Sequence, residues 1–410
     1  MKKVLALLLV VLMISSCLVG CGGKKSKDKI TLTVWAADNA QAFTRKVCDQ
    51  FIADHDDIDL TIEVKAQGEG DVASVVANDP EKAADVFSFA CDQMNDLVDR
   101  MLLLPVYNAY KDQVRENSAF TVEAATAKDE DGEDELQAFP ETGENGYYLV
   151  YDKSVVTDED AQTLEGVLKA CKAAGRSFVI SCGNGFYSCI FPFTGGMECT
   201  GRDEDKIQTF NDYDKSKVID SLLAFSELLH EYSDVIMDDD PTRIGSGFDE
   251  NPRTVAAGID GSWNAATVQE VLGSDFGAAK LPTININGTP TQIRSVKGCK
   301  LIGVNSHTEY PELSQELAAY LTSQEVQQQR LEDLSWAPAN QELLDSLSAE
   351  DYPALYALTE QSAVEGNSSQ VNIVTSFWGP MGTLGKKVKE GDATRSAIED
   401  IFDEIMENFE

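Results

Sequence analysis

The four tryptophans of the chain have the residue type and the setting that best suit ligand contact. Each lies beside small or polar residues at the end of a predicted element: Trp35 before Ala-Ala-Asp-Asn, Trp263 within Gly-Ser-Trp-Asn, Trp336 before Ala-Pro-Ala-Asn and Trp378 before Gly-Pro. The faces of pyranose rings are apolar and their rims carry hydroxyls, so a sugar site needs flat aromatic platforms with Asp, Glu and Asn nearby. The tryptophans therefore indicate a sugar site, with packing in a hinge or core as the alternative for any single one.

Motifs for catalysis are few. The sequence has no GxSxG, HExxH or P-loop motif, and the glycines around Glu69 and Ser246 lack the strand and helix that a dinucleotide-binding loop needs. Carboxylates are so numerous that any two can be imagined as the acid/base pair of a glycosidase, which makes such a pair weak evidence. The sequence predicts a binding protein and not an enzyme, with a surface-anchored glycoside hydrolase as the less favoured alternative.

Neither a metal site nor a cofactor site is predicted. The histidines at 55, 230 and 307 are scattered, no CxxC spacing occurs, and the acidic run 129–135 has its glycine displaced from the position an EF-hand requires. Most of the nine cysteines lie in apolar elements and are interpreted as buried thiols. Cys182, Cys189 and Cys199 are close enough in sequence for a disulfide, so their pairing is left open.

Length and charge limit the class of protein. A chain of 410 residues with 43 % apolar side chains is long enough for two lobes, each with its own core. The formal net charge of −37 repels polyanions, so nucleic acid and anionic membrane surfaces are poor partners.

The N-terminus has the pattern of an export signal. Lys2 and Lys3 precede the apolar run 4–14, which is too short to span a bilayer. Leu18-Val19-Gly20-Cys21 resembles the cleavage box of bacterial lipoproteins, and the stretch ending at Cys17 is a weaker second candidate. We expect a signal peptide over 1–20, a lipidated Cys21 with a polar tether over 21–29, and a mature protein anchored at the extracytoplasmic face of the cell membrane.

From residue 30 onward, apolar residues recur alternately at the spacing of strands and of helices. A strand over 30–34, a helix over 43–51 and a strand over 58–64 form a predicted βαβ unit. On the same grounds we predict buried strands over 84–89 and 147–151, and helices over 218–232, around 317–321 and over 398–409. The alternation indicates an α/β fold with mainly parallel sheets.

No low-complexity linker separates the two expected lobes, so strands are predicted to cross between them. The candidate crossings are 139–146 and 288–297. The predicted N-terminal lobe then comprises 30–140 and 297–335, and the C-terminal lobe 141–296 and 336–410.

The lipoprotein box is followed along the chain by six further short motifs, which are Trp35, 84–92, 139–153, 261–263, 281–283 and 376–378. These seven motifs occur in the order seen in maltose/maltodextrin-binding proteins, the extracellular solute-binding proteins of carbohydrate ABC importers, and the chain resembles that family from about residue 30 to its end. The resemblance implies a two-lobed, periplasmic-binding-protein-like fold with an interlobe ligand cleft and hinge strands. It also implies a monomer without catalysis that delivers an oligosaccharide to a membrane permease.

The resemblance also implies which residues contact the ligand. Trp263 and Trp378 take the place of stacking platforms, while Phe89 and Asp92 take those of an aromatic and of a hydroxyl-binding carboxylate. The remaining candidates from the resemblance are Asp38 and Asn39 after the first strand, Glu144 or Asn145 after the crossing, and either Phe186 or Tyr187 in the second lobe. Trp336 is a further candidate on its sequence setting alone.

One departure from the family pattern leaves the ligand open. A basic residue usual near the first loop is replaced by Ala40-Gln41, so the preferred sugar can differ. The absence of clustered arginines argues against an anion. A polyamine in a carboxylate-lined cleft is the harder alternative to exclude.

Overall fold

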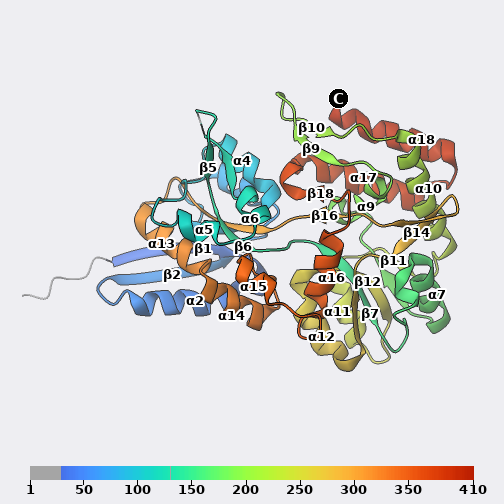
Figure 1. Cartoon of the computed structure of the whole chain (residues 1–410), viewed down its shortest axis with the longest axis horizontal. Coiled ribbons are helices and arrows are strands. Elements are labelled where there is room, and N and C mark those ends of the chain that lie inside the picture. Colours follow the sequence, from blue (N-terminus) through green and yellow to red (C-terminus); the bar gives the residue numbers. More distant parts are fainter. Residues whose placement is uncertain (1–28, 130) are drawn as a thin grey trace, which may run out of the picture.

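The computed structural model describes residues 29–129 and 131–410, which form two α/β lobes joined along the long axis of the molecule (Figure 1). The predicted signal peptide and the lipidation site Cys21 lie outside the described residues. Within the described part, no helix combines the length and apolarity needed to cross a membrane.

The N-terminal lobe is built on a five-stranded mixed sheet. Its βαβ unit matches the sequence prediction, because the first two strands pair in parallel with a helix between them. Leu32, Val34 and Ala36 alternate with more exposed residues, so one face of the first strand is buried. The sheet order is β2 (Asp59–Ala66), β1 (Lys29–Ala36), β3 (Val86–Ala90), β17 (Lys300–Val304), β6 (Phe139–Thr142).

Helices cover this sheet and complete the lobe. In Figure 1 the late helices α13 and α14 lie beside α2, so the chain returns to this lobe after building the other one. The helices are α2 (Gln41–Asp54), α3 (Val72–Asn78), α4 (Met94–Asp99), α5 (Lys111–Arg115), α6 (Ala119–Ala124), α13 (Pro311–Leu321), α14 (Gln324–Leu334) and α15 (Gln341–Asp345).

The C-terminal lobe has a second five-stranded sheet. Its order is β11 (Ile236–Met237), β8 (Ser177–Val179), β12 (Val255–Gly261), β7 (Tyr147–Asp152), β13 (Phe276–Ala279). Its helices are α7 (Leu164–Ala174), α8 (Gly185–Ser188), α9 (Ile190–Thr194), α10 (Lys215–Glu231), α11 (Thr242–Asp249), α12 (Ala265–Leu272), α16 (Pro353–Ser362), α17 (Trp378–Glu390) and α18 (Arg395–Met406).

Short two-stranded sheets decorate the two lobes. They pair β4 (Thr126–Lys128) with β5 (Asp134–Leu136), β9 (Cys199–Arg202) with β10 (Gln208–Phe210), β14 (Thr283–Ile286) with β15 (Thr289–Gln292), and β16 (Val296–Lys297) with β18 (Ser368–Ser369).

The prediction of mainly parallel sheets is wrong. In each of the two five-stranded sheets, two strand pairings are parallel and two are antiparallel. Two strands that are consecutive in one lobe pair in parallel only when a crossover, usually a helix, returns the chain to the same end of the sheet. β17 enters the N-terminal sheet from the other lobe and runs antiparallel to β3 and β6, so the rule that alternating elements give parallel sheets fails there.

The crossings between lobes are partly as predicted. Residues 139–146 lead from β6 in the first sheet to β7 in the second. The second crossing lies later than predicted, because residues 289–292 still pair with β14 in the C-terminal lobe and the chain enters the first sheet only at Lys300.

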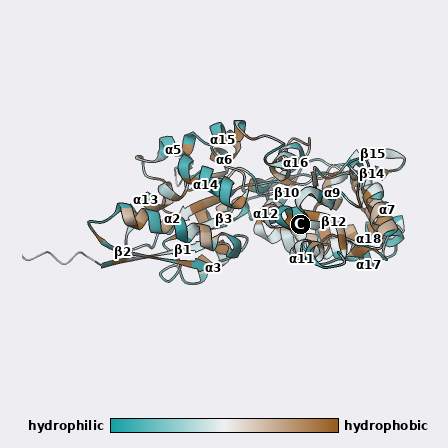
Figure 2. Ribbon diagram, turned by 90° about the horizontal axis from the view of Figure 1, so that it is seen from below, coloured by the Kyte–Doolittle hydropathy of each residue, from teal (hydrophilic) through white to brown (hydrophobic). Residues whose placement is uncertain are grey.

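Each lobe has its own apolar core. One cluster gathers around the N-terminal sheet, and two clusters lie around the C-terminal sheet. Figure 2 shows this division, with hydrophobic segments along strands such as β3 and β12 and hydrophilic ones along outer helices such as α14. The seven described cysteines are free, buried thiols, and these include Cys182, Cys189 and Cys199.

Candidate ligand-binding cavity

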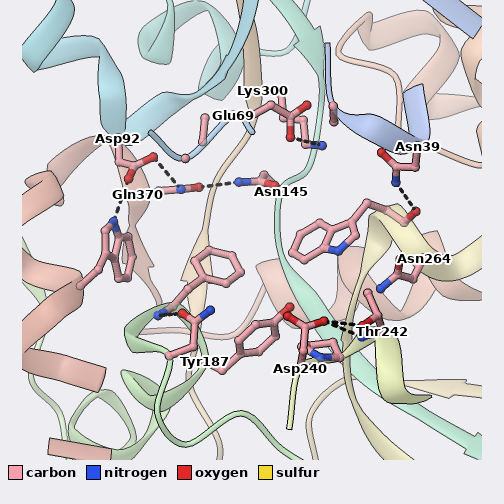
Figure 3. A pocket seen from close by; sticks show the side chains of 18 residues that line it. Asn39, Glu69, Asp92, Asn145, Tyr187, Asp240, Thr242, Asn264, Lys300 and Gln370 are labelled. Atoms are coloured by element: carbon pink, nitrogen blue, oxygen red, sulfur yellow. Dashed lines mark hydrogen bonds and ion pairs between the residues drawn. The ribbon is translucent and has the colours of Figure 1, made fainter. Parts of the chain in front are cut away.

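A cavity of about 510 Å³ lies between the two lobes and is lined by both (Figure 3). Its lining residues are Ala37, Asn39, Glu69, Gly70, Ala90, Asp92, Asn145, Asn184, Phe186, Tyr187, Asp240, Pro241, Thr242, Trp263, Asn264, Lys300, Gln370 and Trp378.

The N-terminal wall of the cavity follows from the parallel part of the first sheet. β1, β2 and β3 point the same way, so the residues after their carboxyl ends meet at one edge. Asn39 follows β1, Glu69 follows β2 and Asp92 follows β3. This edge therefore supplies an amide and two carboxylates to the cavity.

The C-terminal wall is aromatic. Phe186 lies between the two indoles, with its ring centroid 6.0 Å from that of Trp263 and 5.7 Å from that of Trp378. Tyr187 packs edge-on against Phe186 at 5.4 Å. Gly185 allows this close packing, since a Cβ there would lie 1.9 Å from the backbone oxygen of Trp378. Three half-buried rings thus form a continuous apolar surface that faces the carboxylates of the other lobe.

Asp92 links the aromatic wall to the N-terminal lobe. Its carboxylate accepts hydrogen bonds from the indole N–H of Trp378 at 2.8 Å and from the amide of Gln370 at 2.9 Å. Gln370 in turn accepts from the amide of Asn145 at 3.1 Å. Burial raises the pKa of Asp92 to about 6, and the hydrogen bonds from Trp378, Gln93 and Gln370 oppose this rise.

Two further contacts define the opposite end of the cavity. The Asn39 amide donates to the backbone oxygen of Trp263 at 3.1 Å, which joins the two lobes beside that indole. Asp240 accepts from the backbone N–H and the hydroxyl of Thr242, at 2.9 and 2.7 Å. Each lobe therefore offers hydroxyl-binding oxygens to one shared space.

The structure brings together Asn39, Asp92, Phe186, Tyr187, Trp263 and Trp378 from the predicted site residues. At the two positions that the sequence left open, Asn145 lines the cavity where Glu144 does not, and Phe186 and Tyr187 both line it.

Four predicted site residues lie outside the cavity lining. Phe89 is 0 % exposed in the central strand β3. Asp38 is exposed and accepts a hydrogen bond from Gln41. Glu144 accepts from the hydroxyl of Ser362. Trp336 is 3 % exposed and packs in the core of the N-terminal lobe.

Among the polar lining residues, sequence reasoning missed seven, which are Glu69, Asn184, Asp240, Thr242, Asn264, Lys300 and Gln370. Glu69 could have been found, because it follows a predicted parallel strand at the same edge as Asp92. Lys300 and Gln370 had no local signal, since only the tertiary fold brings them to the cavity.

Glu144, which is partly buried beside the cavity but does not line it, gives a testable pH dependence of stability. Burial raises the pKa of Glu144 to about 7 from its ordinary 4.5. The folded state therefore holds this proton more tightly than the unfolded chain, so its contribution to stability is complete below pH 4.5 and is lost as the pH rises through 7. Glutamine does not titrate, so the fall in unfolding free energy between pH 4.5 and 7.5 should be smaller in Glu144→Gln than in the wild type, by on the order of 3 kcal/mol.

Urea unfolding of both proteins across this pH range measures the difference. Glu360→Gln, which changes an exposed carboxylate on α16, is the matched control and should keep the wild-type pH dependence. An unchanged slope in Glu144→Gln would contradict the assigned titration.

Comparison with known proteins agrees with this architecture. The model of the family described as bacterial extracellular solute-binding protein matches residues 46–357. A search of curated proteins gives no sequence match.

Solved structures share the fold at low sequence identity. A structure solved with acarbose has a TM-score of 0.79 at 24 % identity, covering 93 % of this chain and 99 % of that one. The maltodextrin-binding protein MalE1 from L. casei BL23, solved without ligand, has a TM-score of 0.74 at 22 % identity, covering 93 % and 99 %. The GacH receptor of Streptomyces glaucescens, solved unliganded and with acarbose, has a TM-score of 0.74 at 15 % identity, covering 94 % and 100 %.

Proposed function

The chain belongs to the family of bacterial extracellular solute-binding proteins, and we propose that it captures a maltodextrin-like oligosaccharide between its lobes for an ABC import permease. Membership of the family makes it a binding protein rather than an enzyme and gives it an extracytoplasmic location. The finer proposals are that it is a monomer, that lipidated Cys21 anchors it to the membrane, and that the lobes divide close to the predicted bounds of 30–140 with 297–335 and 141–296 with 336–410, except that Trp336 and α15 belong to the N-terminal lobe.

The observation that carries this proposal is the aromatic wall opposite the acidic edge. Trp263, Phe186 and Trp378 offer apolar faces in a row, which suits the CH surfaces of successive sugar rings. Asp92, Glu69 and Asn145 face that wall with acceptors and donors for the hydroxyl rims. The structurally similar proteins include a maltodextrin-binding protein and a receptor solved with acarbose, which supports the same ligand class.

A polyamine is the competing ligand for a cavity with several carboxylates. Against it stands Lys300, whose ammonium lies in the lining and forms an ion pair with Glu69 at 2.8 Å. A polycation would have to displace or repel this ammonium, whereas an uncharged sugar would not.

A thermal-shift screen tests the function directly. Ligand at a hundred times its Kd stabilises the folded state by roughly 2.7 kcal/mol, which corresponds to a rise of several degrees in Tm. We expect this rise with maltotriose or a related neutral oligosaccharide and no rise with spermidine. A panel in which only spermidine raises the Tm would replace the sugar by a polyamine, and no response to any oligosaccharide would contradict the proposal.

A further inference from the structure

Lys300 brings a buried ammonium into the cavity from the middle of the N-terminal sheet. It is the first residue of β17, where it pairs with Ala90 on β3 and Thr142 on β6. Its side chain is only 5 % exposed. Lysine is almost never buried to this degree without a partner, so the surroundings of its ammonium require an explanation.

Three groups surround the ammonium. Its Nζ lies 2.8 Å from Oε2 of Glu69, and it lies 3.9 Å from the ring centroid of Trp336 and 5.8 Å from that of Trp263. Trp336 thus supports Lys300 from the core, although it does not line the cavity itself. Over residues 29–129 and 131–410, Glu69 is the one hydrogen-bonding partner that the structure gives this ammonium. An ammonium has three N–H donors, so donors remain for a group in the cavity.

Glu69 likewise keeps capacity for a ligand. Its Oε1 lies 3.3 Å from the hydroxyl of Ser88, but that same hydroxyl makes a shorter contact with the carboxylate of Glu141. A hydroxyl has a single proton, and the shorter contact with Glu141 takes it. Glu69 is therefore left with an oxygen that can accept, and its side chain is 13 % exposed at the cavity edge (Figure 3).

We propose that Lys300 and Glu69 act together as a clamp that reads adjacent hydroxyls of the bound sugar, the ammonium donating to one and the carboxylate accepting from its neighbour. This inference rests on the proposed sugar-binding function. The clamp places the cation of the cavity on β17. The segment after β1 offers no cation at Ala40 or Gln41, where the sequence pattern of the family would have a basic residue. Charge-assisted hydrogen bonds are about twice as strong as neutral ones, so the pair makes one stretch of the sugar rim a determinant of specificity.

The charge of the clamp also selects the ligand class. Lys300 and Glu69 neutralise each other, which leaves the carboxylates of Asp92 and Asp240 in the lining without an opposing cation there. An oligosaccharide that carries a carboxylate or sulfate would face these acidic groups. The clamp therefore favours uncharged sugars over uronate-containing ones.

Binding of maltotriose and of its monodeoxy analogues to Lys300→Met tests the clamp. Methionine keeps an apolar stem beside Trp336 but has no N–H donors. We expect the Kd for maltotriose to rise roughly tenfold or more, because a hydrogen bond to a charged group is lost. In the wild type, removal of one hydroxyl from the sugar should cost a similar factor, and in Lys300→Met removal of that same hydroxyl should cost nothing further.

Two variants serve as controls. Lys297→Met changes a nearby lysine whose ammonium lies 4.7 Å from the ring of Phe120 and does not line the cavity, so it should bind every analogue as the wild type does. Glu69→Gln combined with Lys300→Met removes both charges, which avoids an unpaired buried carboxylate if the single variant does not fold.

The possible outcomes distinguish a failure of the Lys300–Glu69 clamp from a failure of the proposed sugar-binding function. If the wild type binds maltotriose and Lys300→Met, or the double variant, shows the same penalty for every deoxy analogue as the wild type, the clamp is wrong even if overall affinity falls. If the wild type binds no oligosaccharide of the panel, the proposed function fails and the clamp fails with it.

Discussion

Replacing Trp378 by alanine is expected to raise the Kd for the sugar by roughly 30- to 100-fold, the effect of removing an aromatic anchor from a desolvated pocket. Two losses add up in this variant. The ring 5.7 Å from Phe186 disappears from the aromatic wall, and the carboxylate of Asp92 loses the indole N–H that it accepts at 2.8 Å. Isothermal titration calorimetry with maltotriose measures the result.

Two further substitutions separate these losses. Trp378→Phe keeps a platform but has no N–H, so it should show only the part of the effect that passes through Asp92. Trp35→Ala removes a half-buried indole of the N-terminal lobe that contacts Phe87 and does not line the cavity. It should leave the Kd unchanged while lowering the Tm. Equal affinities for Trp378→Ala and the wild type would remove Trp378 from the site.

The tryptophans also show how far the sequence alone leads. Trp263 and Trp378 were recognisable because each follows or begins an element beside small residues, and both line the cavity. Trp336 has the same local setting, yet it packs in the core beneath Lys300. Local sequence shows that an indole ends an element, but only the fold determines whether that end faces the cavity.

Strand geometry explains the other differences. Phe89 and Phe87 are both 0 % exposed, because β3 is covered on both faces and neither face opens to the cavity. Glu144 and Asn145 are neighbours in the segment between β6 and β7, but the Asn145 side chain bonds Gln370 in the cavity and the Glu144 side chain bonds Ser362 outside its lining, so a one-residue difference exchanges the lining residue. The mixed sheets arise from strands contributed across lobes, which no local pattern reveals.

Three aspartates on one helical segment connect the cavity to the surface, and all three contact the C-terminal lobe. Asp92, Asp96 and Asp99 are spaced four and three residues apart, so they share one face as the chain passes into α4. Asp92 accepts from Trp378 and Gln370, and Asp96 accepts from the hydroxyl of Thr375 at 2.6 Å.

Asp99 ends this acidic face at the surface. Its carboxylate accepts hydrogen bonds from both terminal nitrogens of Arg202, the one from Nη2 at 2.9 Å, and forms an ion pair with the ammonium of Lys206 at 2.9 Å. These two cations hold the pKa of Asp99 below its ordinary value. Burial decreases along the face, from 3 % exposure at Asp92 to 20 % for the side chain of Asp99.

We expect alanine at these positions to weaken sugar binding in the order of burial. Asp92→Ala leaves the indole N–H of half-buried Trp378 and the amide of buried Gln370 without their acceptor, each at a cost of about 1–3 kcal/mol, so the Kd should rise roughly a hundredfold or more. Asp99→Ala removes a partly exposed ion pair worth about 1 kcal/mol, so the Kd should rise only a few-fold. Asp96→Ala should lie between them.

Salt and charge exchange distinguish interlobe contact from direct ligand contact. Raising the ionic strength to 1 M shortens the Debye length to about 3 Å, which should erase the effect of Asp99→Ala but not that of Asp92→Ala. Exchanging the charges in the double variant Asp99→Arg with Arg202→Asp should recover part of the affinity that either single change loses, because the pair joins the lobes and neither residue lines the cavity. If Asp99→Ala weakens binding as much as Asp92→Ala, or if the loss persists in 1 M salt, the graded contribution of these interlobe contacts to sugar binding is wrong.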